Sequence, residues 1–444
     1  MLKTTTKCLL IILLLSVCTG TALAQPKDNS PFSQFGLGEF IDSELPSSHG
    51  MGGLGSVYHD FFEANLENPA SLGFLQYTSL QLGFFVKRSS YTRVDDHQTV
   101  WNGNTNHFSL NIPVINPLNE ALERREANFS WATSISLRPY TQVGYNVRIT
   151  DSIDSIGTIE SDFNGSGGLY NFTWGNGFKY KNLSGGINLG FIRGQQTFNS
   201  QTYFRDLDNA YDDIFQTNIS YKGFQYRAGL IYEQPIDVKT SRDMDDKPSK
   251  LLSIGAFVSG QSDLNTKSDI SRLSANSLIN DVDTSYYVLD APGMATIPGT
   301  WGIGLMYRKS ADFRVGIDYQ AGAWSLYSNE ARPDTMADAW KFAVGGAWIP
   351  DANSITSYFK RVEYRAGFYT KADPRIIEGA QVKETAFTLG AALPFIIQRN
   401  ISWLQIGLDI GGRTGGDRLK DSFVRCNVGF VFNDNSWFIK GKYD

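Results

Sequence analysis

The sequence predicts an all-β fold, a transmembrane antiparallel β-barrel of about 14 strands with an N-terminal plug segment in its lumen. Segments of roughly ten residues alternate apolar and polar side chains, as in residues 77–87, and the pattern recurs as far as Phe432. The chain begins with an export signal, and no later stretch has the length of a membrane-spanning helix. An exported chain of such segments is typical of the bacterial cell outer membrane.

Residues 1–24 are the predicted signal peptide, with a positively charged start, a short apolar core and an Ala-Leu-Ala cleavage site. A lipoprotein anchored through Cys18 is the alternative, but Val17 stands where the lipobox of such proteins needs a small residue. Removal of the signal peptide leaves Cys426 as the single cysteine of the mature chain, which excludes an intramolecular disulfide.

The composition agrees with a barrel in lipid. Aromatic residues make up 13% of the chain and there are 43 glycines, yet the mean hydropathy is mildly negative. An apolar outer face offset by a polar lumen and polar loops explains this mixture. The net charge of −5 argues against nucleic acid as a partner and supplies no basic patch for a membrane surface.

The barrel strands are predicted from the alternation and from the breaks between segments. They span 77–87, 106–115, 126–150, 168–180, 183–193, 217–233, 251–260, 300–308, 312–320, 338–349, 360–370, 384–394, 401–411 and 422–432. Tight periplasmic connections are expected at 181–182, 309–311 and 395–400. Long external loops are expected at 88–105, 151–167, 194–216, 261–299, 321–337, 371–383 and 412–421. An even strand number requires 126–150 to be a single long strand.

Pro139 interrupts this third strand, between Arg138 and Tyr140. Because proline cannot donate a hydrogen bond to a neighbouring strand, it should bend the strand or open a gap beside it. A plain turn is the alternative.

Residues 25–76 do not alternate and are rich in Gly, Ser, Asn and Pro. The segment is too long for a leader and too irregular for a separate domain. A barrel of this size would otherwise enclose an aqueous hole, so a plug, or hatch, inside the lumen is the natural placement. A disordered periplasmic tail is the alternative. The barrel itself is predicted over 77–432, followed by a C-terminal periplasmic tail over 433–444.

The sequence offers no pattern for catalysis or for a cofactor. The four histidines show no ligand spacing and no Cys/His cluster exists, so neither a metal site nor an enzyme is expected.

A glycine-rich stretch followed by Asn-Pro-Ala leads directly into the first strand. In this position the pattern resembles the long-chain fatty acid transporter (FadL) superfamily of outer-membrane proteins. The residues that carry it are Gly52, Gly53, Gly55, Asn68, Pro69 and Ala70. The end of the chain, 433–444, resembles Bacteroidetes members of this superfamily. The resemblance implies that these six residues belong to the hatch and substrate channel, and that Arg138, Pro139 and Tyr140 form a strand kink that opens laterally into the bilayer.

Two functions follow as hypotheses. The first is a passive, porin-like outer-membrane channel for hydrophobic, fatty-acid-like small molecules, with hatch gating and lateral exit at the kinked third strand. The second is a non-transport barrel that acts as a secretion- or assembly-associated protein-binding component. The expected partners are therefore outer-membrane lipid, a hydrophobic small molecule, and other outer-membrane or secretion proteins. An apolar pocket behind the plug would favour transport, whereas a polar or filled lumen with protruding apolar segments would favour protein binding.

Overall fold

The computed structural model describes residues 30–42, 44–93, 96–115, 128–154, 156–207, 210–236, 250–276, 281–310, 312–397, 400–416 and 419–434. The predicted signal peptide and nearly all of the predicted C-terminal tail lie outside the described residues. No helix among the described residues is long and apolar enough to cross a membrane.

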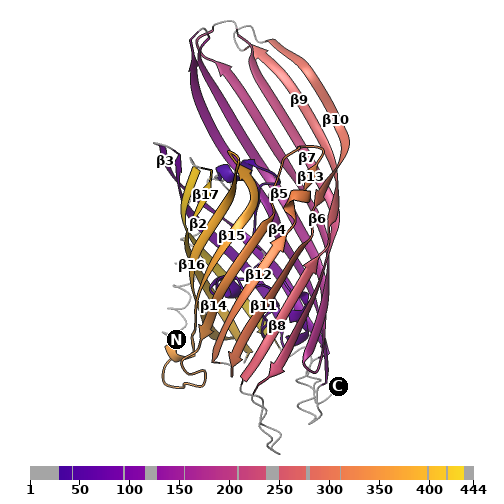
Figure 1. Cartoon of the computed structure of the whole chain (residues 1–444), viewed down its shortest axis with the longest axis vertical. Helices are drawn as coiled ribbons and strands as arrows, with labels where there is room; N and C mark the ends of the chain where they lie inside the picture. Colours follow the sequence, from indigo (N-terminus) through magenta and orange to yellow (C-terminus); the bar gives the residue numbers. More distant parts are fainter. Residues whose placement is uncertain are drawn as a thin grey trace, which may run out of the picture.

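The wall is a single antiparallel sheet closed into a barrel (Figure 1). Its strands are β2 (Thr78–Arg93), β3 (Asp96–Ile115), β4 (Phe129–Ile153), β5 (Gly157–Tyr180), β6 (Leu183–Phe204), β7 (Asp212–Pro235), β8 (Lys250–Ser259), β9 (Ser262–Asn276), β10 (Asp281–Ile297), β11 (Thr300–Lys309), β12 (Phe313–Gly322), β14 (Ala339–Trp348), β15 (Glu363–Ile377), β16 (Ala380–Ile397), β17 (Asn400–Gly415) and β18 (Leu419–Asp434). Pairing of β18 with β2 closes the ring. Shorter elements are η1 (Pro31–Gln34), β1 (Glu39–Phe40), α2 (Pro46–His49), η2 (Pro69–Phe74), η3 (Trp324–Leu326), β13 (Ser328–Asn329) and η4 (Phe359–Arg361).

The barrel has 14 wall strands, as the sequence predicts. β7 pairs with β9 and, further along, with β8. β8 and β9 are therefore one wall strand with a break at 260–261. β10 and β11 form the next wall strand in the same way, because β10 pairs with β9 and β11 pairs with β8. The segment 126–150 is one strand, β4, as the even strand number requires.

Side chains alternate across the wall as the apolar pattern predicts. On β12, Phe313, Val315 and Ile317 are exposed on the outside, whereas Arg314 and Asp318 are buried on the inside. Successive side chains of a strand point to opposite faces, so the lipid-facing row is apolar and the lumen-facing row is polar.

The prediction of external loops is wrong for most of these segments, because the wall strands continue through them. β2 and β3 run through 88–105, and β9 and β10 fill most of 261–299 as a long hairpin. Strands β4 to β7 have 22 to 25 residues each, whereas a strand needs only about 9–11 to cross a bilayer. Beyond the lipid both faces meet water, so these strands lose the apolar alternation by which a strand is recognised.

The long strands rise as one tall wall on one side of the barrel (Figure 1). We call this part of β4–β7, β9 and β10 the extension, and the end that carries it the tall end. The opposite end is the turn end. It holds the tight connections at 181–182 and between Lys309 and Phe313, where the sequence predicts them.

Residues 30–76 lie inside the barrel, and we call them the luminal segment. Their side chains are mostly buried, and they bond to strands all around the ring. The Gly52 amide donates to the Thr388 hydroxyl on β16, and the Ser56 amide donates to Asp318 on β12. The barrel interior is therefore filled by chain that precedes the first wall strand.

Candidate functional site: the luminal segment and its wall

Charge complementarity joins the luminal segment to the wall. The segment carries six acidic residues and no lysine or arginine: Glu39, Asp42, Glu44, Asp60, Glu63 and Glu67. Lysines and arginines on the inner faces of the wall strands meet five of these six acids. These basic residues are Lys87, Arg227, Arg314, Lys341, Lys371, Arg413 and Arg425. The ion pairs tie seven wall strands to one inner chain.

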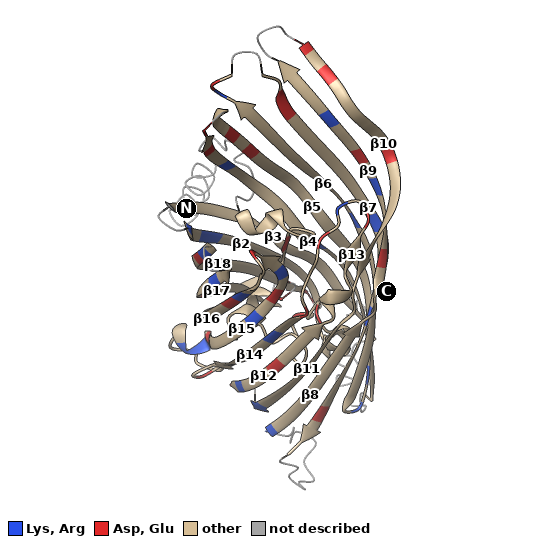
Figure 2. Ribbon diagram, turned by 45° about the horizontal axis from the view of Figure 1, so that its top comes forward, with Lys and Arg blue, Asp and Glu red and all other residues tan. Residues whose placement is uncertain are grey.

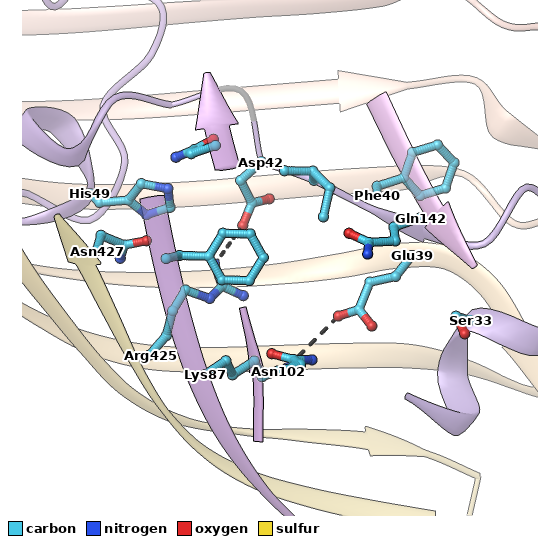
Figure 3. Close-up of a pocket in the computed structure, with 13 residues that line it drawn as sticks. Ser33, Glu39, Phe40, Asp42, His49, Lys87, Asn102, Gln142, Arg425 and Asn427 are labelled. Atoms are coloured by element: carbon cyan, nitrogen blue, oxygen red, sulfur yellow. Dashed lines mark hydrogen bonds and ion pairs between the residues drawn. The ribbon is translucent and has the colours of Figure 1, made fainter. Parts of the chain in front are cut away.

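Two of these acids, Glu39 and Asp42, line the same small pocket in the close-up of Figure 3. Glu39 lies 2.7 Å from Arg413 and 3.8 Å from Lys87, while Asp42 lies 3.0 Å from both Arg425 and Lys371. A cavity of about 30 Å³ remains between them, roughly the space of one water molecule. Breaking such buried pairs singly leaves an uncompensated charge, which costs about 3–5 kcal/mol.

Two acids of the segment, Glu39 and Asp42, are held charged by this wall. Burial raises the pKa of Glu39, but Arg413, Lys87 and Arg375 outweigh burial and hold that pKa well below its usual range. Burial likewise raises the pKa of Asp42, yet Lys371 and Arg425 keep that pKa well below its usual range. Because the pKa values of Glu39 and Asp42 are depressed, their ion pairs stabilise the folded barrel above about pH 4. These ion pairs weaken only on strong acidification.

Asp42, Glu44 and His49 also place potential metal-ligating atoms within 4.8 Å of one another. Lysine and arginine already occupy the carboxylates, Lys341 against Glu44 and Arg425 against Asp42. A divalent cation would have to displace these fixed positive charges. We therefore interpret the cluster as part of the ion-pair network.

The Asn-Pro-Ala motif anchors the segment where it leaves the lumen. The Asn68 side chain accepts a hydrogen bond from the Ala70 amide and so caps η2 at its N-terminus. Its amide nitrogen donates to the backbone carbonyls of Ser56, at 2.5 Å, and of Ala256 on β8, at 3.2 Å. Ser184 on β6 donates to the Ala70 carbonyl at 2.6 Å. The motif thus joins two parts of the segment to two wall strands.

Glycines in the wall leave space for this motif. Gly186 on β6 and Gly229 on β7 face η2, and a Cβ at either position would collide with Pro69 or Asn68. Glycine permits this close approach of two backbones. Asn68 and Ala70 are completely buried as a result, and Pro69 is buried with them.

Replacing Asn68 by alanine should loosen the segment without opening the barrel. The change removes a helix cap and leaves the Ser56 and Ala256 carbonyls short of a donor, at a cost of about 2–3 kcal/mol. We expect a lower thermal unfolding midpoint and faster proteolysis within residues 30–76. Asn199→Ala on β6 is the matched control, and equal stability of the two variants would contradict this role of Asn68.

The glycines at 52, 53 and 55 fit a tight path across the lumen. Gly52 and Gly53 have φ values of +75° and +78°, which favour glycine over other residues. Gly52 also lies against the backbone carbonyls of Val344 and Phe368, where a Cβ would not fit. Gly55 accepts a hydrogen bond from the Asn65 side chain.

Arg138, Pro139 and Tyr140 lie where the wall changes its pairing. A register shift against β5 falls between Pro139 and Thr141. The pairing of β3 with β4 runs from Ile115–Trp131 to Phe108–Leu137, and β1 of the luminal segment pairs with β4 at Thr141 and Gln142 instead.

The side chains on both sides of Pro139 face the luminal segment. The Arg138 side chain is buried in the lumen beside a cavity of about 10 Å³. The Tyr140 ring packs edge-on against Phe40 of β1 at 6.1 Å. The luminal segment thus covers the wall directly beyond Pro139.

Sequence reasoning placed the glycines and Asn-Pro-Ala inside the lumen but missed the charged residues that hold the segment there. A signal was present, because a run of 47 residues with six acids and no lysine or arginine needs basic partners if it is buried in a lumen. The basic partners carry no such signal, since every inner face of a barrel alternates polar residues. Only the closed ring brings Lys87 and Arg413 together on Glu39.

Solved structures share this fold at low sequence identity. The toluene transporter TbuX of Ralstonia pickettii matches with a TM-score of 0.55 at 14% identity, over 89% of this chain and 99% of that chain. A FadL homologue of Pseudomonas aeruginosa gives 0.57 at 12%, over 89% and 99%. The toluene transporter TodX of Pseudomonas putida gives 0.50 at 13%, over 88% and 98%. The FadL-type fold expected from the sequence is confirmed.

The family comparison covers the whole length of the chain. The BamG family model matches residues 1–444. No curated protein sequence matches.

Proposed function

Since the chain belongs to the BamG family, we propose that it is a non-transport outer-membrane barrel, not an enzyme, that binds other outer-membrane or secreted proteins and supports their assembly. In this proposal residues 1–24 export the chain, 25–76 plug the lumen, 77–432 form the barrel and 433–444 face the periplasm.

The free edge of β10 is the observation that carries the proposal. β10 pairs with β9 along its length. Among the described residues, its other side meets β13 at Ala295 and Thr296 and bonds to Glu330 at Met294, all near its lower end. The upper part of β10 therefore presents unpaired backbone N–H and C=O groups at the edge of the extension. Proteins usually shield such edges, because another chain can add a strand to them.

Side chains along this edge fit a protein partner. Val282, Tyr286, Tyr287 and Leu289 are exposed on β10, which rises in the extension (Figure 1). Asp281, Asp283 and Asp290 add negative charge among them, which Figure 2 shows along the upper part of β10. We therefore expect the partner to contribute an extended segment with apolar and basic side chains.

The filled lumen supports the same conclusion. Buried ion pairs and the backbone of the luminal segment occupy the centre of the barrel, where a hydrophobic molecule would need an apolar path. Ion pairs of five acids hold the segment against the wall. Moving the segment as a hatch would break these ion pairs and would therefore cost free energy.

Site-specific photocrosslinking tests the proposal in the native membrane. A crosslinker at Tyr287 should give one defined protein adduct, whereas Gln216, exposed on β7 within the same extension, should give none. The reconstituted protein should also show no saturable uptake of toluene or oleate. Saturable uptake without a Tyr287 adduct would overturn the proposal.

A passive channel for hydrophobic small molecules is the second candidate. The end of the β3–β4 pairing at Leu137, just before Pro139, and a large cavity at the turn end favour it. In that case Gly52, Gly53, Gly55, Asn68, Pro69 and Ala70 act as the hatch, and Arg138, Pro139 and Tyr140 border a lateral exit. The uptake measurement above decides between the two candidates.

A further inference from the structure

The outer surface of β6 and β7 changes from apolar to charged at one pair of residues. Residues 183–191 of β6 and 224–232 of β7 turn only glycine, apolar and aromatic side chains outward. Each stretch has nine residues, close to the 9–11 that a strand needs to cross a bilayer. The next outward residues toward the tall end are Arg193 and Lys222, which therefore lie where the hydrocarbon ends and the headgroups begin.

Arg193 and Lys222 lie directly opposite each other on the β6–β7 ladder, and we call them the cation pair. Side chains at such positions have Cβ atoms about 4.5–5.5 Å apart, and like charges there destabilise a sheet. Both side chains are exposed, and neither forms a hydrogen bond or an ion pair within the part of the chain that the structure describes. An anion held between them would remove this repulsion.

The neighbouring strands supply no such anion. The residues opposite the cation pair on β5 and β9 are Tyr170 and Asn265. Further along, Asp290 of β10 pairs with Lys267 at 3.0 Å, and Asp263 of β9 accepts hydrogen bonds from nearby side chains. The cation pair is therefore open to a negative charge from outside the chain.

Two aromatic rings lie directly below the cation pair, toward the turn end. Phe191 and Phe224 are the next residue pair on the same face, with ring centroids 5.2 Å apart, and Phe224 is 76% exposed. Two cations above an apolar platform match a lipid at this depth, whose phosphate lies above its acyl chains.

We propose that the cation pair binds the phosphate of an outer-leaflet lipid, with an acyl chain of that lipid lying across Phe191 and Phe224. The Arg193 guanidinium presents a fork of donors that fits phosphate oxygens, and the Lys222 ammonium adds a further charge-assisted hydrogen bond. Outer-membrane barrels keep their short turns in the periplasm, so the tall end and this headgroup level face outward. The site rests on a barrel in the outer membrane and on neither the docking nor the transport proposal.

Lipid binding to the full-length protein in detergent, counted by native mass spectrometry, tests this site. Dioleoyl phosphatidic acid carries the phosphate, and dioleoyl glycerol is the same molecule without it. We expect phosphatidic acid to bind at least about tenfold more tightly, and equal affinity would overturn the proposal. An equal concentration of inorganic phosphate should leave the lipid bound. Displacement by inorganic phosphate would show a site for a free anion and contradict the lipid assignment.

Variants separate the cation pair from general charge attraction. Arg193→Gln with Lys222→Gln should weaken phosphatidic acid on the order of tenfold and leave dioleoyl glycerol unchanged. The thermal unfolding midpoint without lipid should not fall, because the change removes a repulsion. Lys383→Gln with Lys420→Gln is the matched control, since these exposed lysines are separated by Thr414 on β17 and cannot share one phosphate. Unchanged affinity in the first variant, or an equal loss in both, contradicts the assignment.

Discussion

Deletion of residues 30–74 is expected to turn a closed barrel into an open pore. Eight-stranded barrels are filled by their own side chains, whereas 16- to 18-stranded barrels hold an aqueous channel, so an emptied ring of 14 strands should conduct. Single-channel conductance in planar bilayers should rise by on the order of tenfold or more above that of the intact protein.

The emptied pore should also select anions. The deletion removes six acidic residues. The seven wall lysines and arginines that pair with them then line the pore. The reversal potential in a KCl gradient measures this preference directly. A conductance equal to that of the intact protein, or cation selectivity, would show that the segment is not the plug.

A milder variant guards against misfolding of the deletion. Asp42→Asn together with Asp60→Asn breaks contacts to Lys371, Arg425 and Arg314 while the segment stays in place. We expect intermittent openings in the same bilayer recordings. Asp281→Asn with Asp283→Asn, at the tip of the extension, is the matched control and should remain closed.

Lysine substitution on the edge of β10 is expected to abolish partner binding while leaving the barrel intact. Tyr286→Lys with Leu289→Lys removes two exposed apolar side chains and adds charge to an open edge, which is how natural proteins prevent strand addition. Partner recovery and the crosslink at Tyr287 should fall by at least about tenfold, since a buried aromatic anchor is commonly worth 2 kcal/mol or more.

The control for this variant lies in the interior of the same extension. Gln216 and Ser220 are exposed on β7, which is paired on both sides, with β6 and with β9. Gln216→Lys with Ser220→Lys adds the same charge without touching a free edge and should retain the partner. Loss of the partner in both variants would mean that the face of the extension, rather than its edge, makes the contact.

The sequence by itself determined the part of the wall that lies in lipid. Phe313, Val315 and Ile317 alternate with polar residues because one face of β12 meets hydrocarbon and the other the lumen, and this is a local, period-two signal. The same rule gave the strand number and the single long strand at 126–150. The Gly-rich run and Asn-Pro-Ala marked the segment that breaks the alternation.

The tertiary structure alone decided what lies above and inside that wall. Strands such as the upper parts of β9 and β10 meet water on both faces, so they leave no apolar alternation and were predicted as loops. The partners of Glu39 and Asp42 are more than 300 residues away at Arg413, Lys371 and Arg425, on strands that only closure of the ring brings together. The free edge of β10 and the cation pair of β6 and β7 exist for the same reason, because each depends on which strands become neighbours.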